Sequence, residues 1–230
     1  MYYTNFAFFW VGKNIEIPQL LVNSINKSYS NEAKVYMLTD KKTPFIDGVT
    51  KTIRSLLPKS IMLGRLKSYA GINKIDDMVF LDADSLVIKK MPKIKSKEDL
   101  IIFQRDPVGK FYYRNLKNEE YPEFQNKNLE DVMPFLFGMI ITHNSSAIKN
   151  FQEMYKVAQK LPERFHTWFA DQYSLQTAFN KGIINAEVKK FSDFCQIISS
   201  PDCLIEKPVI TFKGPHTKSL IKQYFDNCFY

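Results

Sequence analysis

Short apolar runs alternate with segments of helical periodicity along the first half of the chain. In 17–25 and 62–72 the apolar positions recur with the spacing of amphipathic helices. Around these segments lie apolar runs of strand length, at 6–11, 33–38, 49–53 and 79–88. Strands that alternate with helices predict an α/β fold whose central sheet is mainly parallel and flanked by helices.

The second half of the chain has a less regular pattern. Its apolar runs and amphipathic segments predict strands at 100–104, 135–142 and 208–212 and helices at 146–161 and 168–179. From 106 to 128 the chain is polar, rich in tyrosine and not periodic, which is typical of a long functional loop. Because no repeat, low-complexity segment or linker interrupts the sequence, we expect a single domain over 1–230.

The composition indicates a large aromatic core and shows an excess of positive charge. The 230 residues include 19 Phe and 12 Tyr, and the formal net charge is +8. A positive balance favours an anionic partner, but the lysines form no long basic run, so nucleic acid is not expected. The apolar runs are too short to span a membrane, the first residues lack the basic region of a signal peptide, and the three cysteines form no C-x-x-C pair. These features predict a cytoplasmic protein with reduced thiols.

Two acidic residues interrupt the most apolar stretch of the sequence, VFLDADSLVI. Burying an unpaired carboxylate is costly, so Asp82 and Asp84 need a metal, a cation or several hydrogen-bond donors. If the strand ends at Leu81 or Asp82, both carboxylates emerge at the carboxyl edge of the sheet, where α/β folds bind ligands. Oxygen ligands of this kind suit Mg²⁺ or Mn²⁺. The alternative is that the pair caps a turn.

The position of the acid pair in the chain separates the enzyme classes that use one. In haloacid-dehalogenase-like phosphatases such a pair follows the first strand, whereas Asp82 follows at least two strand–helix units. A nucleotidyltransferase would carry a glycine-rich, basic signature after the first strand, which Trp10 to Asn14 does not provide. A non-catalytic protein that binds nucleotide sugars or polyanions is a third alternative.

Seven segments occur in the order found in one family of sugar transferases. They are FFWVG at 8–12, LTD at 38–40, LGRLKSYA at 63–70, FLDADSLV at 80–87, MPFLFGMI at 133–140, WFADQ at 168–172 and FKGPHTK at 212–218. With them the chain resembles nucleotide-sugar glycosyltransferases of the GT-A fold, and within these the glycogenin and lipopolysaccharide-galactosyltransferase-like group, family 8. The resemblance implies a nucleotide-binding half over about 1–90 and an acceptor-side half over about 91–230.

The resemblance also implies a function. The chain would be a metal-dependent glycosyltransferase that moves a sugar from a nucleoside-diphosphate donor, with a UDP-sugar expected, to a glycan or lipid-linked acceptor. The implied cofactor is Mn²⁺ or Mg²⁺. Because a lipid-linked acceptor lies at a membrane, peripheral association with the inner membrane face is a further expectation.

Individual residues receive roles from the same resemblance. Asp84 would bind the metal, and Asp82 would share it or hold the ribose hydroxyls. A histidine usual at the end of the last strand is Thr211 here, so His216 would be the third metal ligand. The remaining donor-binding residues would be Phe9, Trp10, Asp40, Arg65, Gly138, Gly214 and Lys218.

Asp171 and Gln172, at the start of a helix, would contact the donor sugar. In the family these residues accept hydrogen bonds from sugar hydroxyls or stabilise an oxocarbenium-like transition state, and we list them as the candidate catalytic residues. Asp171 could instead cap its helix, because a carboxylate is stabilised at a helix N-terminus.

Overall fold

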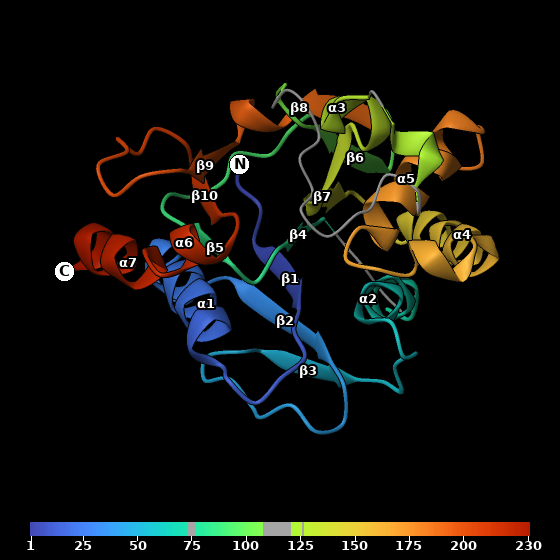
Figure 1. Cartoon of the computed structure of the whole chain (residues 1–230). Coiled ribbons are helices and arrows are strands. Elements are labelled where there is room, and N and C mark those ends of the chain that lie inside the picture. Colours follow the sequence, from blue (N-terminus) through green and yellow to red (C-terminus); the bar gives the residue numbers. More distant parts are fainter. Residues whose placement is uncertain (73–76, 108–120, 126) are drawn as a thin grey trace.

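Two β-sheets organise the chain in the computed structural model, which describes residues 1–72, 77–107, 121–125 and 127–230 (Figure 1). Most of the segment 106–128, predicted to be a long loop, therefore lies outside the described residues. The larger sheet contains, in spatial order, β3 (Lys51–Arg54), β2 (Lys34–Thr39), β1 (Asn5–Phe9), β4 (Met78–Leu81), β7 (Phe135–Thr142), β6 (Leu100–Gln104) and β8 (Glu187–Lys190).

The larger sheet is mainly parallel. Strands β3, β2, β1 and β4 all run in one direction, while β7 is antiparallel to both of its neighbours, β4 and β6. The edge strand β8 is parallel to β6. This arrangement confirms the predicted α/β class with a mainly parallel sheet. The hydrophobic pattern does not encode strand direction, so it could not predict that β7 is reversed.

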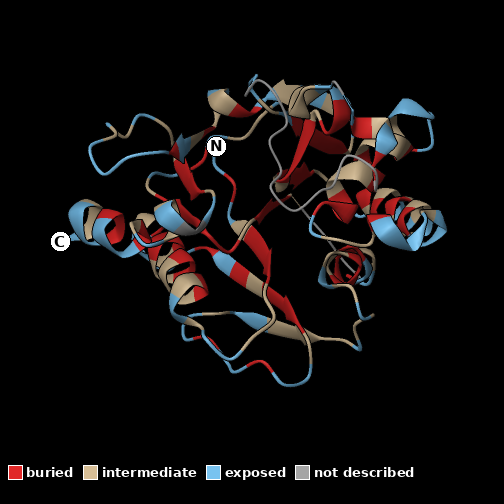
Figure 2. Ribbon diagram, in the orientation of Figure 1, coloured by how far each residue is buried: buried red, intermediate tan, exposed pale blue. Residues whose placement is uncertain are grey.

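Helices cover both faces of the larger sheet, which explains why its central strands are apolar on both sides. Helix α1 (Glu16–Ser28) packs on one face. The other face carries α2 (Ile61–Ala70), α4 (Ala147–Lys160) and α5 (Ala170–Asn180). Figure 2 shows the buried strands between these two helical layers. Within the described ranges, every helix is too short or too polar to span a bilayer.

The smaller sheet lies beside α1 and contains the strands β5 (Ser85–Val87), β10 (Val209–Phe212) and β9 (Cys195–Ile198), in that order. Its apolar side chains pack against α7 (Ile221–Phe229). The remaining short elements are α3 (Leu129–Val132), α6 (Pro215–Lys218) and the 3₁₀ turns Pro122–Phe124, Glu163–Phe165 and Phe191–Asp193.

The acid pair lies where the chain passes from one sheet to the other. Strand β4 ends at Leu81 in the larger sheet and β5 begins at Ser85 in the smaller one, so 82–84 form the connection. The strand therefore ends at Leu81, which is the condition for both carboxylates to emerge at the carboxyl edge of the sheet. Antiparallel pairing of Thr211 with Ser85, together with a 3.0 Å hydrogen bond from the Phe212 N–H to the Asp84 carbonyl, brings the end of β10 beside the acids.

Candidate active site

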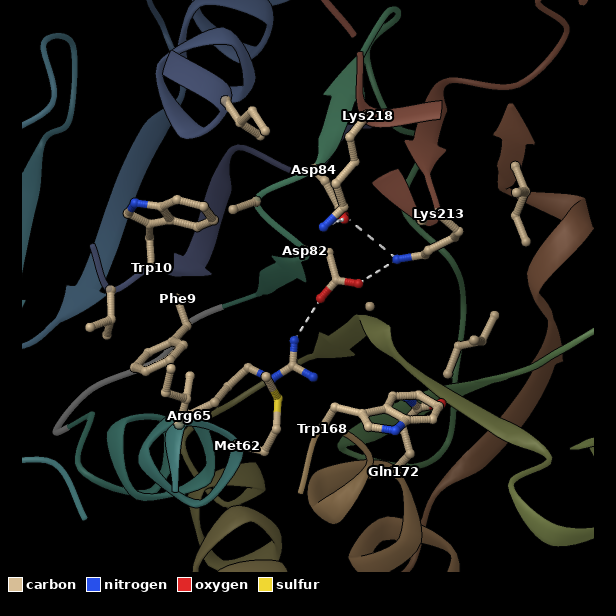
Figure 3. A pocket seen from close by; sticks show the side chains of 18 of the residues that line it. Phe9, Trp10, Met62, Arg65, Asp82, Asp84, Trp168, Gln172, Lys213 and Lys218 are labelled. Carbon is tan, nitrogen blue, oxygen red and sulfur yellow. Dashed lines mark hydrogen bonds and ion pairs between the residues drawn. The ribbon is translucent and has the colours of Figure 1, made fainter. Parts of the chain in front are cut away.

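A cavity of about 720 Å³ opens at the carboxyl ends of β1 and β4, the size of a typical small-molecule site (Figure 3). Segments far apart in sequence meet in its wall. The lining includes Phe9, Trp10, Met62, Arg65, Asp82, Asp84, Arg105, Leu129, Leu136, Gly138, Trp168, Gln172, Lys213, Gly214 and Lys218.

Both carboxylates of the acid pair are held by cations. Asp82 accepts from Arg65 Nη1 at 2.6 Å through one oxygen and from Lys213 through the other. Asp84 Oδ2 lies 2.8 Å from the Lys218 ammonium, and its Oδ1 lies 3.6 Å from Lys213 Nζ. Burial raises the pKa of Asp82, but Lys213 and Arg65 outweigh this and hold it well below its usual range. Asp82 is therefore ionised at neutral pH.

Arg65 links the acid pair to α5. Its Nε donates to Asp171 Oδ2 at 2.6 Å, its Nη2 contacts the same carboxylate, and its guanidinium lies 4.8 Å above the Phe137 ring. Burial disfavours the charged guanidinium, but Asp171 and Asp82 more than compensate and raise the pKa of Arg65. A cation with its N–H groups paired and one face against an aromatic ring is positioned by the fold before any ligand arrives.

Asp171 lies behind the cavity wall, and Gln172 lies in it. Asp171 is 0% exposed, and its Oδ1 accepts from the Gln172 N–H at 2.7 Å. Burial raises the pKa of Asp171, which Arg65 opposes. Gln172 lines the cavity, and its Oε1 accepts from Arg105 Nη2 at 2.7 Å. The predicted contact of Asp171 with the sugar stays a prediction, and in this structure the residue orients Arg65.

Two lining residues, Lys213 and Arg105, received no role from the sequence. Each comes directly after a buried strand, Lys213 after β10 and Arg105 after β6. Burial lowers the pKa of Lys213, but Asp82 and Asp84 outweigh this effect and raise it above its ordinary value. Both residues directly follow a strand built on an apolar run, as Asp82 does, and this position could have identified them in the sequence as candidate site residues.

Gly138 on β7 gives the acid pair its space. A Cβ at this position would lie 2.5 Å from Asp82 Oδ2 and 3.2 Å from Lys213 Nζ. The Gly138 carbonyl accepts from the Asp82 N–H at 2.8 Å. A glycine inside a strand often marks close approach by a ligand or another backbone, and at this glycine the structure shows the Asp82 side chain.

The residues predicted to bind the nucleoside separate into two groups. Phe9 and Trp10 line the cavity at the end of β1, with the Trp10 indole N–H donating to the Asn14 carbonyl at 3.0 Å. Asp40 lies outside the lining and caps its own turn, accepting from the Thr43 N–H at 2.7 Å. The recognition of a base by Asp40 remains a prediction that this geometry does not favour.

The donor set for a divalent ion is incomplete around the acid pair. His216 is exposed and does not line the cavity, while Thr211 is buried and donates to the Asp84 carbonyl at 3.4 Å. Within the described part of the chain, no three His, Cys, Asp or Glu side chains are grouped to hold a metal. Asp84 Oδ1 is buried without a described hydrogen-bond partner and has only the ion pair with Lys213. As they stand, these residues do not fit Mn²⁺ or Mg²⁺.

Comparison with known proteins identifies the fold. No protein-family model matches the sequence, and no curated protein does. Among solved structures, the galactosyltransferase LgtC, determined with donor and acceptor sugar analogues, is similar over 97% of this chain and 95% of its own, at 14% identity and a TM-score of 0.55. The apo-form glycosyltransferase GlyE of Streptococcus pneumoniae is similar over 82% of this chain and 46% of its own, at 15% identity and a TM-score of 0.47.

The similarity to LgtC shows that the chain has the GT-A fold, as its sequence predicts. The haloacid-dehalogenase alternative therefore loses its structural basis. Nucleotidyltransferases share the nucleotide-binding fold, so the residues of the cavity must decide between them and sugar transferases.

Proposed function

We propose that the chain is a glycosyltransferase that moves a sugar from a nucleoside-diphosphate donor to a glycan or lipid-linked acceptor. The observation that carries the proposal is the cavity itself. It brings eight of the residues that sequence reasoning assigned to the donor or the sugar into one wall, together with Asp84, from segments between Phe9 and Lys218. Asp40, Asp171 and His216 are the assigned residues outside it.

The chemistry of the cavity suits a nucleotide sugar laid across it. Phe9 and Trp10 offer aromatic surface for the base, and Trp168 with Gln172 lies on the other side of the acid pair (Figure 3). Between them, Arg65, Lys213 and Lys218 supply cationic donors for a diphosphate. The donor expected from the sequence is a UDP-sugar.

Transfer requires a leaving diphosphate to be stabilised and a sugar to be held. The bond between the anomeric carbon and the β-phosphate oxygen breaks, and the diphosphate keeps the electron pair. The acceptor hydroxyl forms the new bond and gives up its proton, which the departing phosphate can accept. Lys213 and Lys218 lie where that charge would develop, and the Gln172 amide, oriented by Arg105, supplies a donor for sugar hydroxyls.

The metal dependence that the resemblance implies is not part of this proposal. If an ion bound, Asp82 and Asp84 would hold it, and it would act as a Lewis acid toward the diphosphate. The described donor set does not fit such an ion, so none of the steps above uses one. Association with a membrane likewise stays a prediction that follows only from a lipid-linked acceptor.

Binding and turnover of nucleotide sugars test the proposed function. UDP, UDP-glucose, UDP-galactose and GDP-mannose would be screened by thermal shift and for release of the nucleoside diphosphate, with Mn²⁺ and with EDTA. A ligand that binds the folded chain raises its melting temperature. We expect a UDP-sugar to stabilise the wild type and Asp84→Asn to reduce the shift, because this variant loses the charge that holds Lys218 in place.

Asp226→Asn is the matched control, since Asp226 is exposed on α7 and lies outside the cavity. If no nucleoside diphosphate or nucleotide sugar stabilises the wild type in either condition, the proposed function is wrong. Binding of a nucleoside triphosphate with release of pyrophosphate would instead identify a nucleotidyltransferase.

A further inference from the structure

One ammonium group bridges the two carboxylates of the acid pair. Lys213 Nζ contacts Asp82 Oδ2 and lies 3.6 Å from Asp84 Oδ1 (Figure 3). Lys213 follows β10 directly, and β10 is paired with β5 on the far side of the acids. The ammonium thus occupies the position between the two acids that a shared cation would take.

The charges in this cluster are already balanced. The remaining oxygen of Asp82 accepts from Arg65, the remaining oxygen of Asp84 pairs with Lys218, and Arg65 also pairs with the buried Asp171. Three cations therefore compensate three carboxylates in direct contact. Divalent ions bind oxygen ligands whose negative charge is uncompensated, so an entering ion would have to displace at least one ammonium.

The absence of a side chain at Gly138 leaves space for this ion pair. Asp82 and Lys213 meet beside Gly138, where any Cβ would lie 2.5 Å from the carboxylate oxygen and 3.2 Å from the ammonium. The buried hydroxyl of Thr211, two residues before Lys213, donates to the main chain of Asp84 and not to the cavity.

We propose that Lys213 is the resident cation of the acid pair and that the chain binds its donor diphosphate without a divalent metal. This inference rests on the proposed function for the identity of the ligand. Lys213 neutralises the pair that would otherwise repel phosphate. An ammonium has three N–H donors, so Lys213 and Lys218 can hold the carboxylates and still donate to phosphate oxygens.

Two titrations test the proposal. The first measures Mn²⁺ binding by electron paramagnetic resonance in the absence of nucleotide, for the wild type and Lys213→Ala. We expect the wild type to bind Mn²⁺ at least about tenfold more weakly than the variant, because removing the ammonium leaves the carboxylates uncompensated. The second measures UDP affinity by calorimetry, with EDTA and with Mn²⁺.

For UDP, we expect wild-type dissociation constants within about threefold of one another in the two conditions, and Lys213→Ala to lose about tenfold or more in EDTA. Lys213→Arg, which keeps the charge, should retain binding in EDTA. Lys222→Ala on α7 is the matched control, since Lys222 is exposed and outside the cavity. If Lys213→Ala does not fold, Lys213→Gln removes the charge with little change in volume.

Equal Mn²⁺ affinity of the wild type and Lys213→Ala, or UDP binding by the wild type only in Mn²⁺, would overturn the proposal. The Mn²⁺ titration needs no nucleotide. It therefore decides whether Lys213 is the resident cation even if no nucleotide binds, an outcome that would count against the proposed function alone.

Discussion

The two sides of the cavity hold their polar groups in different ways. On one side, the charged cluster of Arg65, Asp82, Asp84, Lys213 and Lys218 is joined by ion pairs between distant segments and anchored on the buried Asp171. On the other side, Gln172 is held by one hydrogen bond from Arg105, beside Trp168, which is 36% exposed. We call this second group the amide side.

This contrast indicates which residues can be replaced without unfolding the chain. A buried ion pair that loses one partner leaves an uncompensated charge. Loss of the uncharged Gln172 amide leaves Arg105 with its bond to the Met133 carbonyl and with access to the open cavity, so it costs less. The charged cluster should therefore be constrained by the fold as well as by the diphosphate. Residues on the amide side should tolerate substitution, so they can be adapted to different sugars.

The largest effect is expected from Arg65→Ala. The substitution leaves Asp171 fully buried without its guanidinium and removes a partner from Asp82, which should lower the free energy of unfolding by about 3–5 kcal/mol. Urea denaturation followed by circular dichroism measures the change. Arg65→Lys, the charge-preserving control, should lose less. A loss below about 1 kcal/mol for Arg65→Ala would show that these ion pairs contribute no more to stability than ordinary surface salt bridges.

The next effect is a pH dependence confined to the charged cluster. The folded-state pKa of Asp82 is lowered, so the stability it contributes is present above its unfolded pKa of about 3.9 and is lost as the pH falls below that value. Asp82→Asn should cost about 1.5–3 kcal/mol at pH 7. The difference from the wild type, measured by urea denaturation, should shrink as the pH falls below about 4. Gln172→Ala has no titrating group, and its difference should not depend on pH.

Much of the charged cluster could be predicted from the sequence because its signal is local. A short apolar run followed at once by Asp82 and Asp84 indicates a strand end, and β4 does end at Leu81. Arg65 stands on a segment with helical spacing. The ion pairs between these residues have no such local signal. Lys213 meets Asp82 across 131 residues through β5 and β10, and no periodicity in the sequence encodes that contact.

Other parts of the fold were missed for identifiable reasons. Strand β8 reads EVKK and lies at the sheet edge with half-exposed residues, so it shows no apolar run. Strand β9 and helix α7 received no prediction, and they pack around the smaller sheet, whose existence depends on the β5–β10 pairing. Asp40 has the strand-end position of a site residue, yet its carboxylate is used in its own turn.

A smaller effect is expected from Gly138→Ala. The new Cβ would lie 2.5 Å from Asp82 Oδ2, so the carboxylate and Lys213 must shift, at a cost of about 1–3 kcal/mol in unfolding free energy. UDP affinity measured by calorimetry should fall with it. Gly71→Ala is the control, because its Cβ would come no closer than 3.4 Å to a neighbour and its φ is −92°. Unchanged UDP affinity in Gly138→Ala would show that diphosphate binding does not depend on the geometry of the Asp82–Lys213 ion pair.

The smallest effect on stability is expected from Gln172→Ala on the amide side. One hydrogen bond is lost, and Arg105 keeps its 2.7 Å bond to the Met133 carbonyl, so the free energy of unfolding should fall by no more than about 1.5 kcal/mol. UDP lacks the transferred sugar that would reach this side, so its dissociation constant should stay within about twofold. Sugar transfer should fall, because an interaction made with the sugar in the transition state is removed. A loss of UDP affinity as large as the loss of transfer rate would show that the two sides of the cavity do not act separately.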